Sequence, residues 1–146
     1  MSLGGKQYDL SSADALLIFA EGKAEAAIKA FADGYDYVYI HVEAPDECGH
    51  RAETENKVLS IEKIDAEILA PVLSYLEGCG EDYRIMVLPD HPTPIHLRTH
   101  TSDPVPFLIY DSAKDVNGVS VFDEDTATAT GYYVADGYRL MELLTK

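Results

Sequence analysis

The chain has 146 residues, about the size of one domain, and its 47% hydrophobic and 25% charged residues are ordinary for a globular protein. It carries 11 basic and 26 acidic residues, and the resulting net charge of −15 repels nucleic acid and anionic lipid surfaces. The composition therefore argues against both as partners and predicts a solvated acidic surface.

The start of the chain and its cysteines indicate where the domain begins and in which compartment the protein works. Residues 1–5 (MSLGG) are interpreted as a vector-derived or truncated start, and residues 6–146 as a single α/β metal-binding domain cut from a longer protein. No secretory segment is visible, which predicts a cytoplasmic protein. Cys48 stands between Asp46 and His50, so a thiolate ligand is an alternative, but a small buried thiol is the favoured interpretation.

The first half of the chain predicts a helix, a strand and a second helix. Apolar residues at helical spacing favour a helix from about Glu21 to Phe31, with a stop at Gly34. Alternating residues predict a strand over 35–43, followed by a Pro/Gly turn that holds Asp46 and His50. Residues 55–77 predict a helix with one buried face, formed by Val58, Ile61, Ile64, Ile68, Val72 and Leu76, in which Pro71 marks a kink or a second start.

The second half predicts further strands and a closing helix. Gly78 and Gly80 end the helix before a strand over 83–88, and a right-handed crossover would make this strand parallel to the one over 35–43. A polar loop over 92–103 and a third strand over 105–110 follow. Residues 111–125 are turn-like, with Asn117-Gly118 as a hairpin tip, and 138–144 predict a short helix. The predicted fold class is α/β, a sheet flanked by helices.

Acidic and imidazole side chains follow both of the first two predicted strands. Asp46 and His50 come after the first strand, Asp90 and His91 come directly after the second, and His100 stands nine residues further on. Open α/β sheets hold ligands at the carboxyl ends of their strands. Mixed imidazole and carboxylate groups suit Zn, Mn and related divalent ions, so the pattern predicts a metal site.

Three other polar residues near these motifs have no assigned ligand role. His41 is interpreted as a structural histidine or as a support for a ligand. His96 and Arg98 are interpreted as solvent-exposed loop residues, with contact to a substrate phosphate as the alternative. The sequence contains no glycine-rich nucleotide loop of the GxxxxGK[ST] kind.

The motifs EAPDECGH, LPDHPTP and RTHTSDPVPF together carry a family resemblance. They resemble the C-terminal metal-binding motifs of archaeal-type cofactor-independent phosphoglycerate mutases, members of the alkaline phosphatase superfamily, from about Glu21 to the end of the chain. The resemblance implies an alkaline-phosphatase-like sheet. It also implies two divalent ions (Mn, Zn or Mg), one bound by Asp46, His50 and His100 and the other by Asp90 and His91.

The resemblance further implies a reaction on a small phosphorylated metabolite. Phosphate would pass between 2- and 3-phosphoglycerate through a serine that precedes the region covered here, so no catalytic residue is assigned in this chain and no turnover is expected from it alone. One alternative is a homoserine kinase of the same superfamily, and another is a non-catalytic metal-binding module. A homo-oligomer is an alternative to a monomer, because an excised domain exposes apolar surface.

Overall fold

The computed structural model describes residues 13–114 and 118–145, which divide into two compact units. Within these ranges, unit 1 comprises the chain up to Cys79 together with Thr93–Thr99, and unit 2 comprises Gly80–Pro92 and the chain from His100 onward. The expectation that residues 6–146 act as a single domain stays a prediction.

Helix α1 (Ala13–Ala32) confirms the first predicted helix and begins several residues earlier than expected. It ends at the predicted glycine. Gly34 adopts a φ of +90°, its N–H donates to the Phe31 carbonyl (2.9 Å), and the Tyr35 N–H donates to the Ala30 carbonyl (3.1 Å). Such a left-handed residue favours glycine, because a side chain would be strained there.

The strand predicted over 35–43 is not present among the described residues. The side chains do alternate as expected, since Val38, Ile40 and Val42 are half-buried whereas Tyr39 and His41 are exposed. In the part of the chain that the structure describes, no strand pairs with this segment, and a ladder needs a partner because its backbone hydrogen bonds run between strands. The alternation therefore reports two faces of this segment and not a strand within a sheet.

The turn predicted around Asp46 and His50 is also wrong, because these residues lie in helix α2 (Ala44–Arg51). Pro45 occupies the first turn, where proline is tolerated because its missing N–H would have no helical partner. Acidic residues in the first turn and basic residues in the last turn suit the helix dipole. The residues taken as helix breakers are thus compatible with a short helix.

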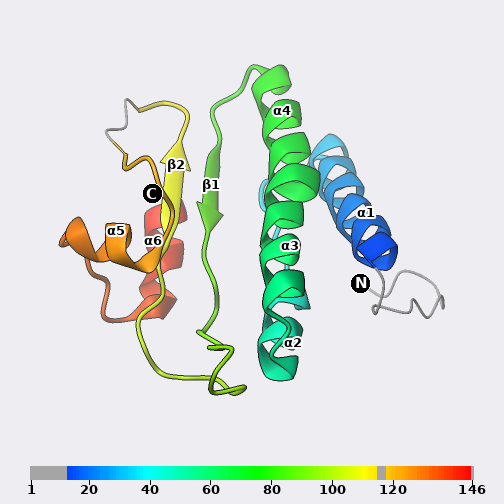
Figure 1. The fold of residues 1–146 in the computed structure, drawn as a ribbon. Helices are drawn as coiled ribbons and strands as arrows, with labels where there is room; N and C mark the ends of the chain where they lie inside the picture. The colour runs from blue at the N-terminus through cyan, green and yellow to red at the C-terminus, as the bar shows by residue number, and fades with distance from the viewer. Residues whose placement is uncertain (1–12, 115–117, 146) are drawn as a thin grey trace. The chain divides into compact units, whose positions relative to one another are not determined.

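The predicted helix over 55–77 is confirmed as a continuous helical run (Figure 1). It consists of α3 (Thr54–Ile64), a π-helical turn η1 (Asp65–Leu69) and α4 (Ala70–Cys79). Pro71 marks the start of α4, and the Ala70 N–H donates five residues back to the Asp65 carbonyl. Because proline has no N–H and crowds the preceding turn, the wider π-turn takes up the disturbance. Gly78 lies inside α4, and Gly80, with a φ of +71°, follows its end.

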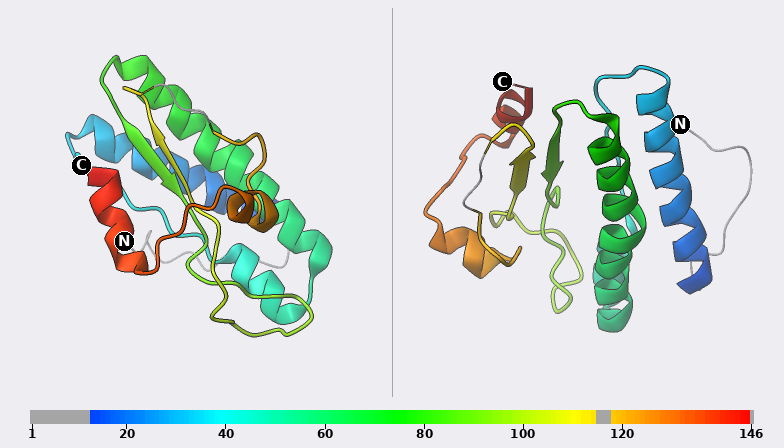
Figure 2. Two further views of the ribbon diagram at one scale, coloured as in Figure 1. Left: turned by 90° about the vertical axis from the view of Figure 1, so that its left-hand side faces the viewer. Right: turned by 90° about the horizontal axis from the view of Figure 1, so that it is seen from above.

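The core of unit 1 lies where α1 runs beside η1 and α4 (Figures 1 and 2). Ala24, Ala27 and Val72 are buried there, and partly buried apolar residues pack around them, namely Ile28, Phe31, Val38, Ile40 and Leu76. The predicted buried face is correct for its later members. It is wrong for Val58 and Ile61, which are 52% and 53% exposed on α3.

Unit 2 contains a two-stranded antiparallel sheet of β1 (Arg84–Val87) and β2 (Leu108–Asp111). The strands predicted over 83–88 and 105–110 are therefore confirmed in place, although each is shorter. Arg84 pairs with Asp111 and Val87 with Leu108. The predicted parallel pairing is wrong, because its first strand is absent and the two strands that do pair run in opposite directions.

The rest of unit 2 consists of short helices. Helix α5 (Glu124–Ala129), which was not predicted, begins after Asp123, whose Oδ1 accepts from the Thr126 N–H at 2.7 Å. The 3-10 turn η2 (Gly137–Arg139) and helix α6 (Leu140–Thr145) confirm the predicted closing helix, with Leu140 buried. Asn117 of the predicted hairpin tip lies outside the described residues.

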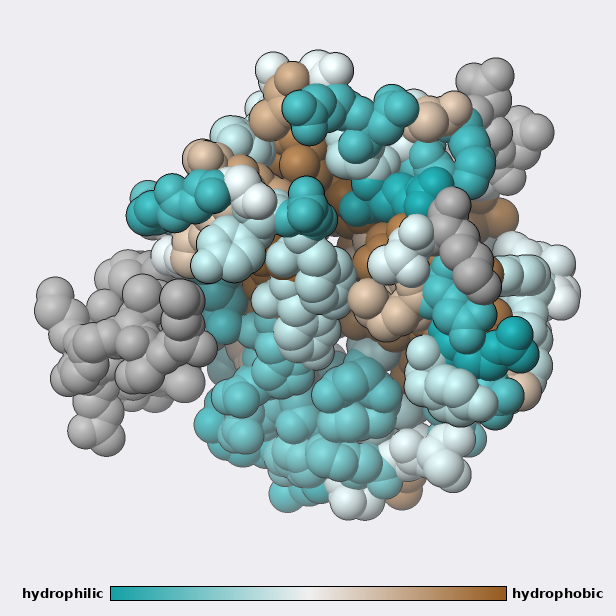
Figure 3. Space-filling view, turned by 180° about the vertical axis from the view of Figure 1, so that it is seen from behind, coloured by the Kyte–Doolittle hydropathy of each residue, from teal (hydrophilic) through white to brown (hydrophobic). Residues whose placement is uncertain are grey.

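The surface seen from behind is mostly hydrophilic, with hydrophobic atoms visible between the hydrophilic side chains (Figure 3). Among the described residues, none of the helices has both the length and the apolar character needed to cross a membrane.

Candidate metal centre

The predicted ligands are divided between the two units. Asp46 and His50 belong to unit 1, whereas Asp90, His91 and His100 belong to unit 2.

Asp46 and His50 lie one turn apart on the same face of α2. The Oδ2 atom of Asp46 is 3.4 Å from the Nε2 atom of His50, and the two side chains are 30% and 35% exposed. The helix therefore achieves the convergence that was expected from a turn.

The remaining polar atoms of this pair contact the segment Thr93–Thr99. The Thr93 hydroxyl donates to Oδ1 of Asp46, and Nδ1 of His50 lies 3.0 Å from the backbone oxygen of Arg98. Because a carbonyl oxygen can only accept, the proton of the neutral imidazole is assigned to Nδ1. The lone pair of Nε2 then faces Oδ2 of Asp46.

Close packing brings α2 against this segment. Gly49 is buried, and a Cβ atom built on it would lie 2.6 Å from the backbone oxygen of Thr93. Thr93 is 4% exposed, and Lys57 donates from Nζ to that same oxygen at 2.8 Å. Thr93 and Lys57 were not predicted from the sequence, and the only sequence signal for Thr93 is its place between two prolines directly after Asp90-His91.

The predicted ligands in unit 2 contact one another. The backbone N–H of His91 donates to Oδ1 of Asp90 at 3.1 Å, and Oδ2 of Asp90 is 3.5 Å from Nε2 of His91. The side chain of Asp90 is 60% exposed. The rings of His91 and His100 stack with their centroids 3.7 Å apart and their planes at 30°.

Cys48 is buried on α2, which agrees with its interpretation as a small buried thiol. Burial, followed by the negative charge of Glu53, raises the pKa of the Cys48 thiol. A higher pKa disfavours the thiolate that a metal ion needs. His41 is exposed and stacks on Tyr39 with ring centroids 6.3 Å apart, and its supporting role stays a prediction. His96 and Arg98 are exposed, as loop residues are expected to be.

The donor atoms on α2 fit a divalent cation. Zinc binds imidazole nitrogen and carboxylate oxygen at about 2.0 to 2.2 Å, so two such ligands at a tetrahedral angle lie roughly 3.4 Å apart. The separation between Oδ2 of Asp46 and Nε2 of His50 is 3.4 Å. In addition, each side chain has its second polar atom engaged by the protein, which is typical of metal ligands.

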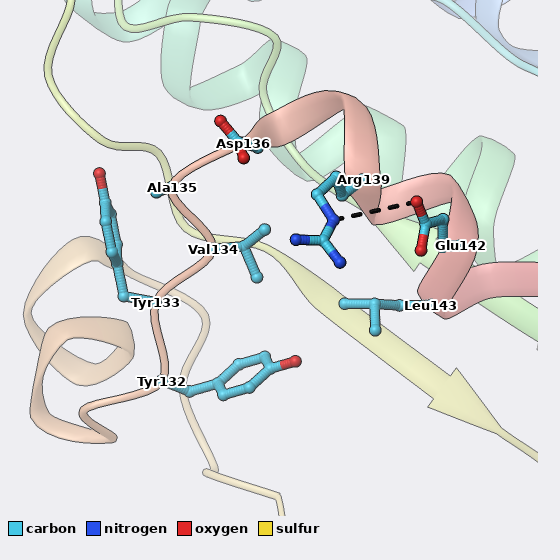
Figure 4. Close-up of a pocket in the computed structure, with 8 residues that line it drawn as sticks. All are labelled: Tyr132, Tyr133, Val134, Ala135, Asp136, Arg139, Glu142 and Leu143. Carbon is cyan, nitrogen blue, oxygen red and sulfur yellow. Dashed lines mark ion pairs between the residues drawn. The ribbon is translucent and has the colours of Figure 1, made fainter.

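A shallow pocket of about 280 Å³ lies elsewhere in unit 2 (Figure 4). It is lined by residues that follow α5 and by residues of η2 and α6, among them Tyr132, Tyr133 and Leu143. Arg139 and Glu142 form an ion pair there at 3.9 Å between Nε and Oε1. None of the predicted ligands lines this pocket.

The carboxylate and imidazole pair on α2 offers the kinds of donor atoms that divalent metal ions bind, and the family comparison agrees with this class of protein. Residues 6–144 match the Metalloenzyme superfamily, and the chain belongs to this family. Relatives with longer chains carry a more specific name. A protein of Geobacter sulfurreducens named probable 2,3-bisphosphoglycerate-independent phosphoglycerate mutase is 47% identical over 125 residues, which cover 85% of this chain and 31% of that protein.

Two archaeal relatives carry the same mutase name. The protein of Methanothrix thermoacetophila is 46% identical over 84% of this chain and 31% of its own length, and that of Methanosarcina mazei is 50% identical over 73% of this chain and 27% of its own length. The chain thus spans about a third of these relatives. No solved structure matches the chain. The homoserine kinase alternative has no support from these comparisons.

Proposed function

We propose that this chain is the C-terminal metal-binding portion of a 2,3-bisphosphoglycerate-independent phosphoglycerate mutase. The whole enzyme would interconvert 2- and 3-phosphoglycerate through a phosphoserine, with two divalent ions (Mn, Zn or Mg) and an alkaline-phosphatase-like sheet. The observation that carries the proposal is the Asp46 and His50 pair on α2, with its donor atoms 3.4 Å apart. Family membership and the mutase names of the relatives support the choice of enzyme.

The ligands are assigned as the family resemblance implies. Asp46, His50 and His100 bind one ion, and Asp90 and His91 bind the other. Thr93 and Arg98 are the residues that contact Asp46 and His50.

The residues of this chain prepare the site before any ion binds. Asp46 presents an anionic oxygen next to an imidazole nitrogen whose lone pair is directed by the contact of Nδ1 with the Arg98 carbonyl. When bound, divalent ions supply positive charge that activates a hydroxyl nucleophile and stabilises the phosphoryl group during transfer. The serine that accepts the phosphoryl group is assigned outside this chain, so the chain alone is expected to lack turnover.

The remaining parts of the proposal concern the substrate, the compartment, the partners and the oligomeric state. The substrate would be a small phosphorylated metabolite in the cytoplasm, and the net charge of −15 disfavours nucleic acid and anionic membranes as partners. A homo-oligomer stays an alternative to a monomer, and size-exclusion chromatography at high concentration decides between them.

Calorimetric titration with Mn and Zn tests the proposed function. The wild-type chain, Asp46→Ala, His91→Ala and the exposed-loop control His96→Ala are compared. We expect binding by the wild type, loss of binding in Asp46→Ala, and retention in His96→Ala and His91→Ala. Failure of the wild type to bind either ion, or unchanged binding in Asp46→Ala, would contradict the proposed site.

A further inference from the structure

We propose that Thr93 and the backbone of Arg98 are positioning groups that set which atoms of Asp46 and His50 face the metal ion. This inference rests on the proposed function, because it assumes that the α2 pair binds metal. All four residues lie in unit 1. Nothing in the motif resemblance assigns a role to Thr93 or to the Arg98 backbone.

Thr93 fixes the rotation of the Asp46 carboxylate. Its hydroxyl donates to Oδ1, and this leaves Oδ2 as the oxygen that lies 3.4 Å from Nε2 of His50. The threonine is itself well held, since it is 4% exposed and its backbone oxygen accepts from Nζ of Lys57 at 2.8 Å. Pro94, which directly follows Thr93, also restricts its backbone to extended conformations. A rigid donor therefore directs the carboxylate.

The Arg98 backbone fixes the tautomer of His50. Arg98 has a φ of +56°, a left-handed conformation that is uncommon for a residue with a side chain. The conformation is held by a tight turn in which the N–H groups of Leu97 and Arg98 donate to the Pro94 carbonyl at 3.0 and 2.9 Å. Strained backbone of this kind gathers at functional sites. Here the Arg98 carbonyl is directed at Nδ1 of His50, and Nε2 is left as the nitrogen that binds metal.

Hydroxyl and methyl substitutions at Thr93 separate positioning from packing. Thr93→Val keeps the shape but removes the hydroxyl, whereas Thr93→Ser keeps the hydroxyl and removes a methyl group. Loss of a group that orients a ligand typically weakens metal binding about 10-fold to 100-fold. We expect that loss of Mn affinity by calorimetry in Thr93→Val, and affinity within about threefold of wild type in Thr93→Ser and in the exposed control Thr99→Val.

The unfolding midpoint is measured on the same variants. Thr93→Val is expected to lower the midpoint, because the hydrogen bond to the Asp46 carboxylate is lost, and Thr93→Ser to lower it slightly, because a buried methyl group is lost. Wild-type Mn affinity in Thr93→Val would overturn the inference for Thr93. Equal loss of affinity in both Thr93 variants would also overturn it, because that result indicates packing alone.

The Arg98 part is tested without metal, so its outcome is independent of the proposed function. Nitrogen-15 spectra of the imidazoles at pH 8 are expected to show His50 with its proton on Nδ1. Arg98→Gly, which keeps the carbonyl and adopts the left-handed conformation easily, is expected to retain this tautomer. A His50 proton on Nε2 in the wild type would overturn the assignment. A wild-type chain that binds no ion but shows the Nδ1 tautomer would instead contradict the proposed function and leave the Arg98 contact established.

Discussion

Unit 1 buries small apolar side chains between its helices, whereas unit 2 buries the carboxylate of Asp111 between two cations. In unit 1, Ala24, Ala27 and Val72 form the core. In unit 2, Oδ2 of Asp111 lies 2.7 Å from Nε of Arg84 and 2.8 Å from Nζ of Lys114. Leu140 is the large aliphatic residue that is buried there among the described residues.

Because of this difference, the two groups of predicted ligands are expected to respond to different kinds of substitution. Asp46 and His50 rest on a helix that packs closely against Thr93, so their positions depend on shape. Asp90 and His91 contact each other and follow β1, whose partner strand carries Asp111. Changes of volume are therefore expected to disturb the first group, and changes of charge the unit that carries the second.

The largest expected effect comes from Gly49→Ala. A Cβ atom at this position would lie 2.6 Å from the Thr93 backbone oxygen and 2.9 Å from its Cγ2 atom. Overpacking of this kind destabilises by about 1 to 3 kcal/mol, so we expect a lower free energy of unfolding in urea and weaker Mn binding. Gly22→Ala on α1 is the control, because a Cβ atom there meets nothing within 4 Å. Equal stability of the two variants would show that α2 does not depend on close packing.

A smaller effect is expected from acid, and it belongs to unit 2. Hydrogen bonds from Lys114 and Arg84 lower the pKa of Asp111 to about 2. The pKa of an aspartate in the unfolded chain is about 3.9. Ionised Asp111 therefore stabilises the fold fully above that pH, and this contribution is lost as the pH falls towards about 2. Thermal unfolding followed from pH 7 to pH 2 should show this loss in the wild type and in Asp103→Asn, an exposed control. Asp111→Asn should be less stable at pH 7 and lack that component, and an identical profile in all three proteins would contradict the ionic account.

The smallest expected effect concerns the two cysteines of unit 1, which lie on different helices. Cys48 is buried on α2 and its pKa is raised, whereas Cys79 is exposed at the end of α4. Because the thiolate is the reactive form, a disulfide reagent at pH 7.5 should label Cys79 at least about tenfold faster. Mass spectrometry of the peptides measures both rates, and labelling in denaturant provides the control. Comparable rates in the folded chain would mean that α2 opens readily.

Much of the fold follows from periodicity in the sequence. The sequence predicts helices over about 21–31, 55–77 and 138–144 because apolar residues recur there at helical spacing, and helices are present in all three regions. The segment over 35–43 was misread because the alternation of its side chains does not specify whether a strand partner exists. The sequence does not predict helix α2, because proline and glycine usually break helices. Here, however, Pro45 suits the first turn, and Gly49 is needed for close packing.

The candidate site was predicted in part. The spacing of Asp46 and His50 indicated convergence, and a helix brings the two together as well as a turn would. Thr93 and the Arg98 carbonyl could not be predicted, because their roles depend on a hydroxyl direction and a backbone angle that follow from tertiary packing. Contacts made through backbone atoms leave little trace in residue identity.

The path of the chain limits how this protein can be dissected. Unit 1 is discontinuous, because Thr93–Thr99 returns to it from unit 2. A chain cut after Cys79 would keep all of α1 to α4. It would lose the Thr93 hydroxyl that contacts Asp46 and the Arg98 carbonyl that contacts His50. Deletion boundaries drawn from the helices alone would thus yield a piece that keeps Asp46 and His50 and loses both contacts that orient them. A gene fragment that encodes unit 1 must join the sequence up to Cys79 to the sequence of Thr93–Thr99, because truncation after Cys79 removes the second segment.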